Sequence, residues 1–342
     1  MSKPLPILSH MPFHVKLAIV ESVDTMTKLS IRQCSKEFKN VVEKSKIVFV
    51  SLEFTARTIR DDYSCEQRYI QLVIWFEEYH VIDLEIASRT PEGFILKHRQ
   101  QRSEIVMNTG NFIDAAVDKF LVFLRIFPNV YVKHLVVNLR GSNERIRGYE
   151  AQNQQILDCL ERGLMSLNRR VSAKELIIRT TTSEQQNMIR VLRFMKPRTL
   201  ETITLGSCKS RYNMDVDLDK VADTIQWKQA KRLEVQHRYH SLPQKDTSQF
   251  EIVWWEERVF TAEMLNECLQ NFLVHSHWKE RRFDCDYLDV DQLWNSLSQY
   301  ETKQISRYQR TCIMSESCKL KIQMDHNELL TFVRICRKPY TY

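Results

Sequence analysis

Two pairs of closely spaced histidines are the first residues in this sequence whose types could do chemistry. His275 and His277 stand two positions apart, and His237 and His240 stand three apart. Either pair could supply two ligands to a zinc ion, which also needs cysteine, histidine or carboxylate ligands to complete its set. No cysteine or acidic residue completes a set at a standard spacing, and the H-E-x-x-H motif is absent. We therefore expect surface or interface histidines and no metal site.

Aspartates gather at two places in a way that is suggestive of calcium loops. They are Asp215, Asp217 and Asp219, and then Asp284, Asp286, Asp289 and Asp291. An EF-hand loop needs glycine at its sixth position and a bidentate glutamate at its twelfth. Counting from Asp215, these positions hold Lys220 and Gln226; counting from Asp284, they hold Asp289 and Asn295. We interpret both clusters as helix N-caps and solvated surface.

Motifs of nucleotide-binding proteins and esterases are also missing. Loops that cradle phosphates need several glycines close together, whereas this chain has six glycines and no G-x-G-x-x-G, Walker or G-x-S-x-G motif. Its nine cysteines and ten histidines show no local nucleophile signature, although a fold can still bring a cysteine or serine near a base. The sequence predicts no catalytic residue, no cofactor and no enzymatic activity, and an uncharacterised hydrolase stays open as an alternative.

The charge balance argues against nucleic acid as a partner. The 50 basic and 43 acidic residues give a net charge of +7 over 342 residues, with both signs mixed along the chain, whereas nucleic-acid binders concentrate basic residues on one face. No stretch has the roughly 18 apolar residues of a membrane span, and prolines interrupt the N-terminus where a secretory signal would be apolar. The cysteines form no C-x-x-C pair. We expect reduced cysteines, no nucleic-acid or membrane partner, and a cytoplasmic and/or nuclear location.

The elements that would position any site begin with three short helices. Apolar residues recur at helical spacing, and Asp24 and Ser35 stand where N-caps would start the second and third helices. The recurring residues are Val15, Ala18, Ile19 and Val23, then Met26, Leu29, Ile31 and Cys34, then Phe38, Val41 and Val42. Units of about 40 residues or fewer usually need a metal, disulfides or a partner to become stable. Either a partner covers these helices, or they cap the rest of the chain.

After residue 45 the pattern becomes mixed α/β. A strand is predicted at 46–54 and a helix around 65–80, and from there helix patterns alternate with short strands. The predicted strands cover 81–87, 132–139, 173–180, 200–206, 230–236 and 281–290. Their centres lie 27 to 51 residues apart, which is too uneven for a regular leucine-rich repeat. We predict an irregular, leucine-rich-repeat-like α/β solenoid with parallel strands along one face; a compact two-layer α/β domain is the alternative.

The C-terminal stretch "KLKIQMDHNELLTFVRI" predicts a β-hairpin. It contains two alternating runs joined by Asp325, His326 and Asn327, residues that tolerate tight-turn geometry. We expect this hairpin to close the end of the array, since terminal units of a solenoid act as caps.

The segment from Leu8 to Val42 resembles an F-box, the three-helix motif that docks substrate receptors on the Skp-type adaptor of cullin-RING ubiquitin ligases. The residues that carry the resemblance are Met11-Pro12, where the motif has Leu-Pro, Val15, Ile19, Val23-Asp24, Leu29, Ile31-Arg32 and Cys34. Phe13-His14 replaces the usual acidic pair, and the aromatic residue after Cys34 comes one position late, at Phe38. The resemblance implies that the adaptor covers the helices and contacts Met11, Pro12, Val15, Ile19, Leu29 and Ile31.

The rest of the chain resembles the FTH domain of the nematode F-box A family. The resemblance rests on "IQWKQAKRLEVQ" at 225–236, on "FTAEMLNECLQNFLVHSHWKERRF" at 260–283 and on the terminal hairpin. It implies a substrate-recognition role. We therefore assign residues 1–45 to the F-box and 46–342 to an α/β recognition region, with an FTH-like domain at about 180–342.

These observations lead to a non-enzymatic adaptor that binds a Skp-type protein, through it a cullin, and an unknown target protein. A protein-interaction scaffold outside any ligase is the alternative. In a solenoid, the side chains that alternate with the buried Leu135, Leu176, Ile203 and Leu233 point into the open strand face. The expected target-binding residues are His134, Glu175, Thr202, Thr204, Arg232 and Glu234.

Overall fold

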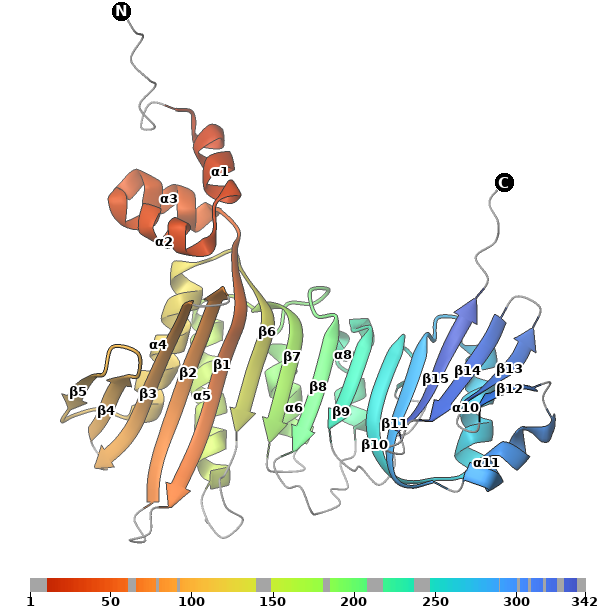
Figure 1. Cartoon of the computed structure of the whole chain (residues 1–342). Helices are drawn as coiled ribbons and strands as arrows, with labels where there is room; N and C mark the ends of the chain where they lie inside the picture. The colour runs from red at the N-terminus through yellow and green to blue at the C-terminus, as the bar shows by residue number, and fades with distance from the viewer. Residues whose placement is uncertain are drawn as a thin grey trace, which may run out of the picture. The chain divides into compact units, whose positions relative to one another are not determined.

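The computed structural model describes most of the chain as mixed α/β, with an N-terminal helical region followed by strands of a large sheet (Figure 1). The described residues are 11–60, 66–77, 80–90, 93–139, 149–180, 185–207, 218–236, 247–288, 290–299, 302–306, 309–315, 318–324 and 329–336. The chain divides into two compact units. Unit 1 comprises Met1–Arg179 and Arg190–Leu200, and unit 2 comprises Thr180–Ile189 and Glu201–Tyr342.

Unit 1 begins with three helices that end and restart as predicted. They are α1 (Phe13–Ser22), α2 (Thr25–Cys34) and α3 (Lys36–Lys44). Asp24 Oδ1 accepts a hydrogen bond from the Thr27 backbone N–H at 2.8 Å, and Ser35 Oγ accepts one from the Phe38 N–H at 3.2 Å. Each bond satisfies an orphan donor of a first helical turn. Both predicted N-caps are confirmed.

An antiparallel meander follows the helices. Its strands are β1 (Ile47–Arg60), β2 (Glu66–Glu77), β3 (His80–Thr90), β4 (Gly93–His98) and β5 (Ser103–Met107), and each pairs antiparallel with the next. The helix predicted around 65–80 was wrong, because that segment forms β2. The strand predicted at 81–87 lies in β3 and is not preceded by a helix, so the helix-then-strand order does not hold in this part of the chain.

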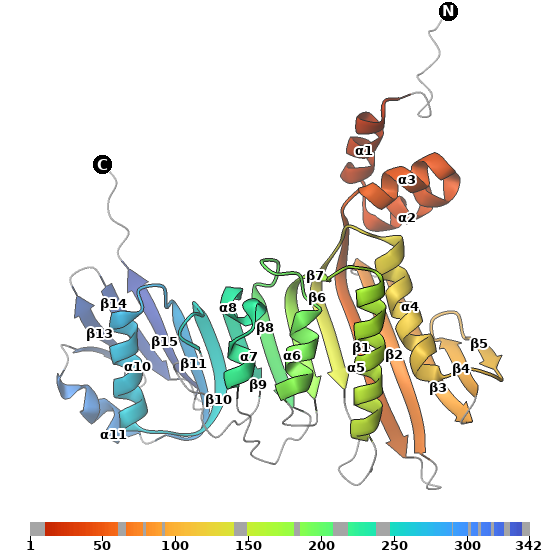
Figure 2. The same ribbon diagram turned by 180° about the vertical axis from the view of Figure 1, so that it is seen from behind.

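A helix-then-strand order begins with α4. The elements are α4 (Phe112–Ile126), β6 (Val130–Leu139), α5 (Tyr149–Ser166) and β7 (Ser172–Thr180). β6 pairs parallel with β1, and Figure 2 shows α4 and α5 side by side on one face of these strands. The helices approach closely, since a Cβ added at Gly163 of α5 would lie 2.0 Å from Leu121 Cδ1 of α4. On the sheet side, Phe120 of α4 packs edge-to-face on Phe54 of β1 at 5.8 Å.

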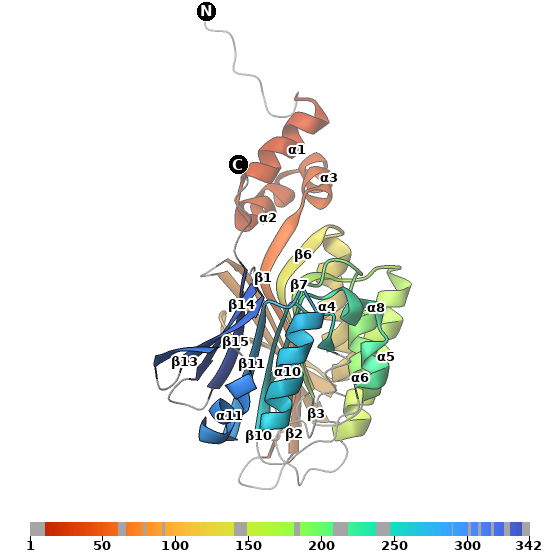
Figure 3. The same ribbon diagram turned by 90° about the vertical axis from the view of Figure 1, so that its right-hand side faces the viewer.

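Unit 2 continues the alternation of helices and strands. Its first elements are β8 (Thr202–Ser207), α7 (Asp219–Ala222), α8 (Ile225–Gln229), β9 (Arg232–Gln236), β10 (Ile252–Phe260), α10 (Ala262–Val274) and β11 (Glu280–Leu288). Strands β8 to β11 are parallel neighbours. α8 and α10 lie on the same face of them (Figures 2 and 3). The helix α6 (Gln185–Arg193) contributes residues to both units.

The last elements of unit 2 are antiparallel. They are α11 (Val290–Ser296), the 3-10 turn η2 (Leu297–Gln299), β12 (Thr302–Ser306), β13 (Gln309–Ser315), β14 (Cys318–Met324) and β15 (Leu329–Cys336). β15 returns against β11, and β14, β13 and β12 follow in that order. The predicted C-terminal hairpin is confirmed as β14 and β15, which pair from Cys318 and Cys336 to Met324 and Leu330.

The predicted core positions are buried. Leu135, Leu176, Ile203 and Leu233 are each at most 1 % exposed, as predicted. In unit 2 the register aligns Ile203 with Leu233, Leu233 with Val253, and Val253 with Arg281. An arginine therefore ends a row of buried aliphatic side chains, a feature that the hydrophobic pattern did not predict.

Candidate functional site

The N-terminal helices are fastened to the first strand through α2. Thr25 Oγ1 donates a hydrogen bond to the carbonyl oxygen of Val48 at 3.3 Å, and Lys28 Nζ donates one to that of Lys46 at 3.0 Å. Both donors are buried. These two bonds connect α2 to the start of the first strand.

The six residues predicted to contact an adaptor are apolar residues of this N-terminal region. We call this set the apolar face: Met11, Pro12, Val15, Ile19, Leu29 and Ile31. None of the six is buried; Pro12 is exposed and the other five are partly exposed. Phe13, which follows Pro12, is also exposed. Adjacent apolar side chains left open to solvent mark an interaction site when they form a continuous patch.

Two ion pairs link charged groups of different helices. Lys16 of α1 is buried and forms an ion pair with Glu37 of α3, and Arg32 Nη2 of α2 lies 3.0 Å from Glu43 Oε1 of α3. A buried cation must be paired or hydrogen-bonded to offset its lost hydration. These pairs connect the three helices. The hydrophobic pattern of the sequence did not indicate the buried Lys16.

In unit 1 the structure brings two of the predicted target-binding residues together. His134 on β6 and Glu175 on β7 are joined by a 2.7 Å contact between Nδ1 and Oε2. The His134 side chain is about half exposed, at 48 %, and that of Glu175 is 22 % exposed. Both groups are therefore reachable on the strand face.

In unit 2 the predicted target-binding residues do not all reach the surface. Arg232 Nη2 and Glu234 Oε1 of β9 form an ion pair at 2.7 Å, and Thr202 of β8 is half-buried. Thr204 is only 1 % exposed, which corrects the prediction that its side chain points into an open face. Its register partner on β9 is Glu234.

Trp254 of β10 is a further residue of this strand face that the sequence analysis missed. It aligns with Glu234 on one side and with Arg282 on the other, and it is half-buried. Its indole Nε1 is buried without a hydrogen-bond partner among the described atoms. Tryptophan is enriched among the residues that contribute most of the binding energy at protein interfaces. The sequence signal that could have indicated it is the apolar run "IVWW" at 252–255. This run is recognised as a strand once its pairing with β9 and β11 is known.

The histidine pair His275 and His277 lies in an aromatic cluster around a buried arginine. The guanidinium of Arg281 stacks on Trp278, with its Cζ 3.6 Å from the ring centroid, and His275 stacks on the same tryptophan at 5.0 Å. Burial lowers the pKa of Arg281 to about 9. The His277 ring nitrogen Nε2 lies 2.7 Å from the carbonyl oxygen of Ser248. Among the residues with described side chains, no group of three metal-ligand types could hold a metal ion.

The surroundings of His275 predict that the stability of this cluster depends on pH. Burial, followed by the nearby His277 and Arg281, lowers the pKa of His275 below its usual value of about 6.5. The unfolded chain then binds more protons than the folded chain, so stability present above about pH 6.5 is lost as pH falls through that value. We expect the denaturant concentration at the unfolding midpoint to decrease as the pH is lowered from about 7.5 to about 5.5. The decrease should be smaller in the variant His275→Gln.

His14→Gln, which removes an exposed histidine from α1, is the matched control and should follow the wild-type pH profile. An identical acid-side decline in wild type and His275→Gln would contradict the expected role of His275.

The two buried cysteines of the described residues are poor candidates for a nucleophile. Cys159 and Cys268 are buried and Cys34 is exposed, and all three are free thiols. Burial raises the pKa of Cys268 to about 12, and burial with a hydrogen bond to Asp114 raises the pKa of Cys159. A thiol with a raised pKa is a poor nucleophile. His237, His240, Asp215, Asp217 and Asp289 lie outside the described residues.

Comparison with protein-family models decides the family of this chain. The F-box domain model matches residues 8–49, and the FTH domain model matches residues 154–299. This is an F-box protein with an FTH domain. Neither the comparison with curated proteins nor that with solved structures gave a match.

The F-box match covers α1, α2, α3 and the first residues of β1. F-box domains bind Skp-type adaptors and, through them, cullins, and F-box proteins in general are non-enzymatic adaptors of ubiquitin ligases. The FTH match runs from α5 to η2 and includes the Arg281 cluster. Within the described residues, no helix combines the length and apolar character needed to cross a membrane.

Proposed function

We propose that this F-box protein is the substrate-recognition subunit of a Skp/cullin/F-box ubiquitin ligase. The apolar face of α1 and α2 docks the Skp-type adaptor, and the α/β region binds a target protein. In this proposal the chain acts as a non-enzymatic adaptor without a cofactor or metal, and ubiquitin transfer takes place on other subunits. It works in the cytoplasm and/or nucleus, with neither nucleic acid nor membrane as a partner.

The observation that carries this proposal is the open apolar face on helices that match the F-box model. Val15 and Ile19 of α1, with Leu29 and Ile31 of α2, stay partly exposed although the helices have buried contacts of their own. Burying apolar area gains about 25 cal/mol per Å². A partner that covers this face removes it from water, which supplies the driving force for docking.

Target binding is assigned to strand faces that carry polar and aromatic side chains. In unit 1 the residues are His134 and Glu175, and in unit 2 they are Thr202, Arg232, Glu234 and the added Trp254. In Figure 1 no described helix of unit 2 covers the face of β8 to β10 turned to the viewer. In this account the helix-then-strand segments serve as an irregular α/β solenoid that presents these side chains.

The test is an affinity recovery of the tagged full chain from cells treated with a proteasome inhibitor. Point variants are preferable to removal of residues 1–45, because Thr25 bonds to Val48 of β1 and Lys28 bonds to Lys46, the residue before β1. We expect Ile19→Glu to lose the Skp-type adaptor and cullin while retaining targets. We expect the double variant Arg232→Ala, Glu234→Ala to retain adaptor and cullin while losing targets.

Two controls match these variants. Ala18→Glu adds the same charge at an exposed neighbouring position of α1, and Asp118→Ala with Arg125→Ala removes one exposed charge of each sign from α4. Recovery of targets without cullin from the wild-type chain would favour the scaffold outside a ligase. Equal recovery of adaptor with Ile19→Glu and with wild type would refute docking through the apolar face.

A further inference from the structure

Strand β5 forms an open edge of the sheet in unit 1. It pairs with β4 on one side, from Phe94 and Met107 to His98 and Ser103, and in the part of the chain that the structure describes no strand lies beyond it. All five of its residues are exposed. An edge strand leaves a row of backbone N–H and C=O groups that can pair with another strand. β5 therefore offers both hydrogen-bonding groups and side chains to a partner.

A row of apolar side chains ends uncovered at β5. On the face that packs against α4, the register aligns one residue from each of the strands β1 to β5: Ala56, Ile70, Ile86, Leu96 and Ile105. The first three are at most 2 % exposed, Leu96 is half-buried, and Ile105 is 55 % exposed. Met107 lies on the same face as Ile105 and is 42 % exposed. Figure 2 shows β5 beyond α4, so the helix covers the beginning of the row and leaves its end open.

β5 lacks the features that usually protect an edge strand. Lysine, proline or a bulge on an edge makes pairing with a further strand unfavourable. In unit 2, β12 ends the strand order, and it has Lys303 and a register shift between Gln304 and Ser306. By contrast, β5 pairs with β4 without a register shift, and its one charged residue is Glu104. The edge at β5 is therefore suited to pairing.

The sequence of β5 is complementary to itself in an antiparallel pair. A two-fold axis at Val106 places this residue opposite Val106 of a second copy, and Ile105 opposite Met107. The next pair is Glu104 with Asn108, a carboxylate opposite an amide that can donate a hydrogen bond to it. Apolar side chains then meet apolar ones across the pair, which stabilises a sheet. An axis at Glu104 would instead place two carboxylates opposite each other, which is destabilising.

We propose that β5 is a dimerisation strand, which pairs antiparallel with β5 of a second copy of this chain around a two-fold axis at Val106. The pairing continues the apolar row, because Met107 of one copy follows Ile105 of the other. Both copies use the same surface, so the assembly closes at two chains. The inference goes beyond the proposed function and does not involve the apolar face of the N-terminal helices.

The expected dimer is weak and reversible. An interface of standard size uses about 20–30 residues on each side, whereas β5 has five residues. We therefore expect a dissociation constant on the order of 10 µM. The degree of dimerisation then depends on protein concentration.

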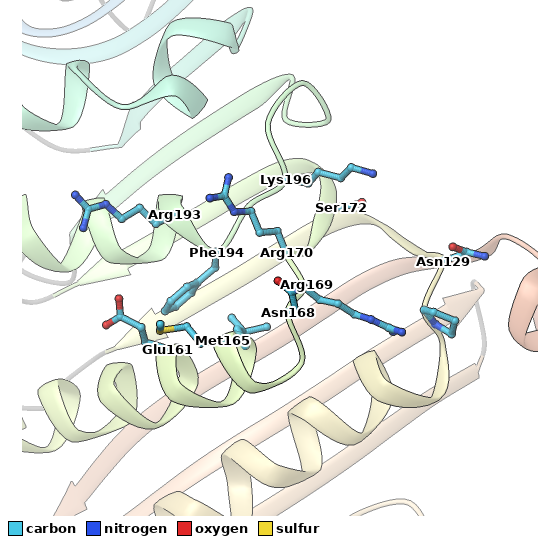
Figure 4. Close-up of a pocket in the computed structure, with 12 residues that line it drawn as sticks. Asn129, Glu161, Met165, Asn168, Arg169, Arg170, Ser172, Arg193, Phe194 and Lys196 are labelled. Carbon is cyan, nitrogen blue, oxygen red and sulfur yellow. The ribbon is translucent and has the colours of Figure 1, made fainter.

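Exposure of an apolar side chain does not by itself identify this surface. Met165 of α5 is 74 % exposed, but it lines a cavity together with Arg170 and Arg193 (Figure 4). In a two-fold contact at Met165 these cations would lie close to the same cations of a second copy, which is unfavourable. Met165 therefore provides a matched control position outside β5.

The experiment measures the mass of the full chain by sedimentation equilibrium at concentrations from about 1 to 100 µM. We expect the mean mass to rise from 40.9 kDa toward twice that value. Val106→Lys should weaken the dimer at least about tenfold, because two like charges replace a pair of valines. Val106 is 43 % exposed, so this variant should unfold at the wild-type midpoint. Met165→Lys adds the same charge elsewhere in unit 1 and should dimerise as wild type.

A charge swap tests the position of the two-fold axis. Val106→Glu should weaken the dimer as Val106→Lys does. An equimolar mixture of the two variants should associate within about threefold of the wild-type affinity, because opposite charges then lie opposite each other. A mixture that associates no better than either variant alone would contradict an axis at Val106.

Three further results would overturn the proposed dimer. A wild-type mass of 40.9 kDa at every concentration would leave the edge of β5 to a different protein. A dimer that Val106→Lys does not weaken would place the interface elsewhere on the chain. A mass that rises beyond two chains would indicate open-ended association instead of a closed pair.

Discussion

Changing Arg281 to alanine is expected to lower the free energy of unfolding of unit 2 by about 2–4 kcal/mol. Its Nη1 donates hydrogen bonds to the carbonyl oxygens of Glu251 and Glu280 at 3.2 and 2.9 Å, and its Nη2 donates one to that of Phe250 at 3.0 Å. The residue is 1 % exposed. Truncation would leave a cavity against Trp278 and carbonyl groups without their donors. Denaturant unfolding of the full chain measures the loss.

Arg282 provides the matched control, because it is the next residue on β11 and points to the other face. Its side chain is 42 % exposed and pairs with Glu280. An exposed ion pair contributes about 0–1 kcal/mol, so Arg282→Ala should change stability by less than about 1 kcal/mol. Equal losses in the two variants would contradict the structural role of Arg281.

Changing Trp227 to alanine should cost about 3–5 kcal/mol, the range for truncating a fully buried large aromatic residue. Trp227 of α8 has no exposed surface, and it meets Phe250 edge-to-face with ring centroids 5.0 Å apart. Its loss removes the contact between α8 and the segment before β10. A fall in the thermal unfolding midpoint, together with the denaturant midpoint, measures the effect.

Ile225, two residues earlier on the same short helix, is 51 % exposed. Ile225→Ala keeps the helix and removes an apolar side chain from the surface, so its effect should stay within about 0.5 kcal/mol. If Trp227→Ala proved as mild as Ile225→Ala, α8 would not be packed as described.

The elements with strong periodicity could be predicted from the sequence. The caps at Asp24 and Ser35, the helices before β6, β7 and β11, and the C-terminal hairpin follow from local rules of capping, spacing and turn residues. The burial of Leu135 and Leu176 followed in the same way, because alternation fixes which strand residues face the core.

Strand β2 could not be predicted because both of its faces carry apolar side chains. Ile70, Leu72 and Ile74 are buried on one face, while Val73 and Trp75 lie on the other and are partly exposed. The result is a continuous apolar run, which periodicity alone cannot tell from a buried helix. Its antiparallel partners β1 and β3 decide the matter through long-range pairing.

The candidate sites also differ in how far the sequence could predict them. The residues of the apolar face stand within a short segment, so a motif could indicate them. The exposure of Thr204 and the role of Trp254 depend on neighbouring strands, and the pattern missed both.

The most direct test of the central claim is the dissociation constant between the purified chain and a purified Skp-type adaptor, measured by titration calorimetry. A carboxylate at a desolvated interface loses hydration without gaining a partner, which costs several kcal/mol. We predict that Ile19→Glu weakens binding at least about a hundredfold while unfolding at the wild-type midpoint, and that Ala18→Glu binds within about threefold of wild type. Binding of Ile19→Glu at wild-type affinity, or no binding by the wild-type chain, would contradict docking of the adaptor on the apolar face.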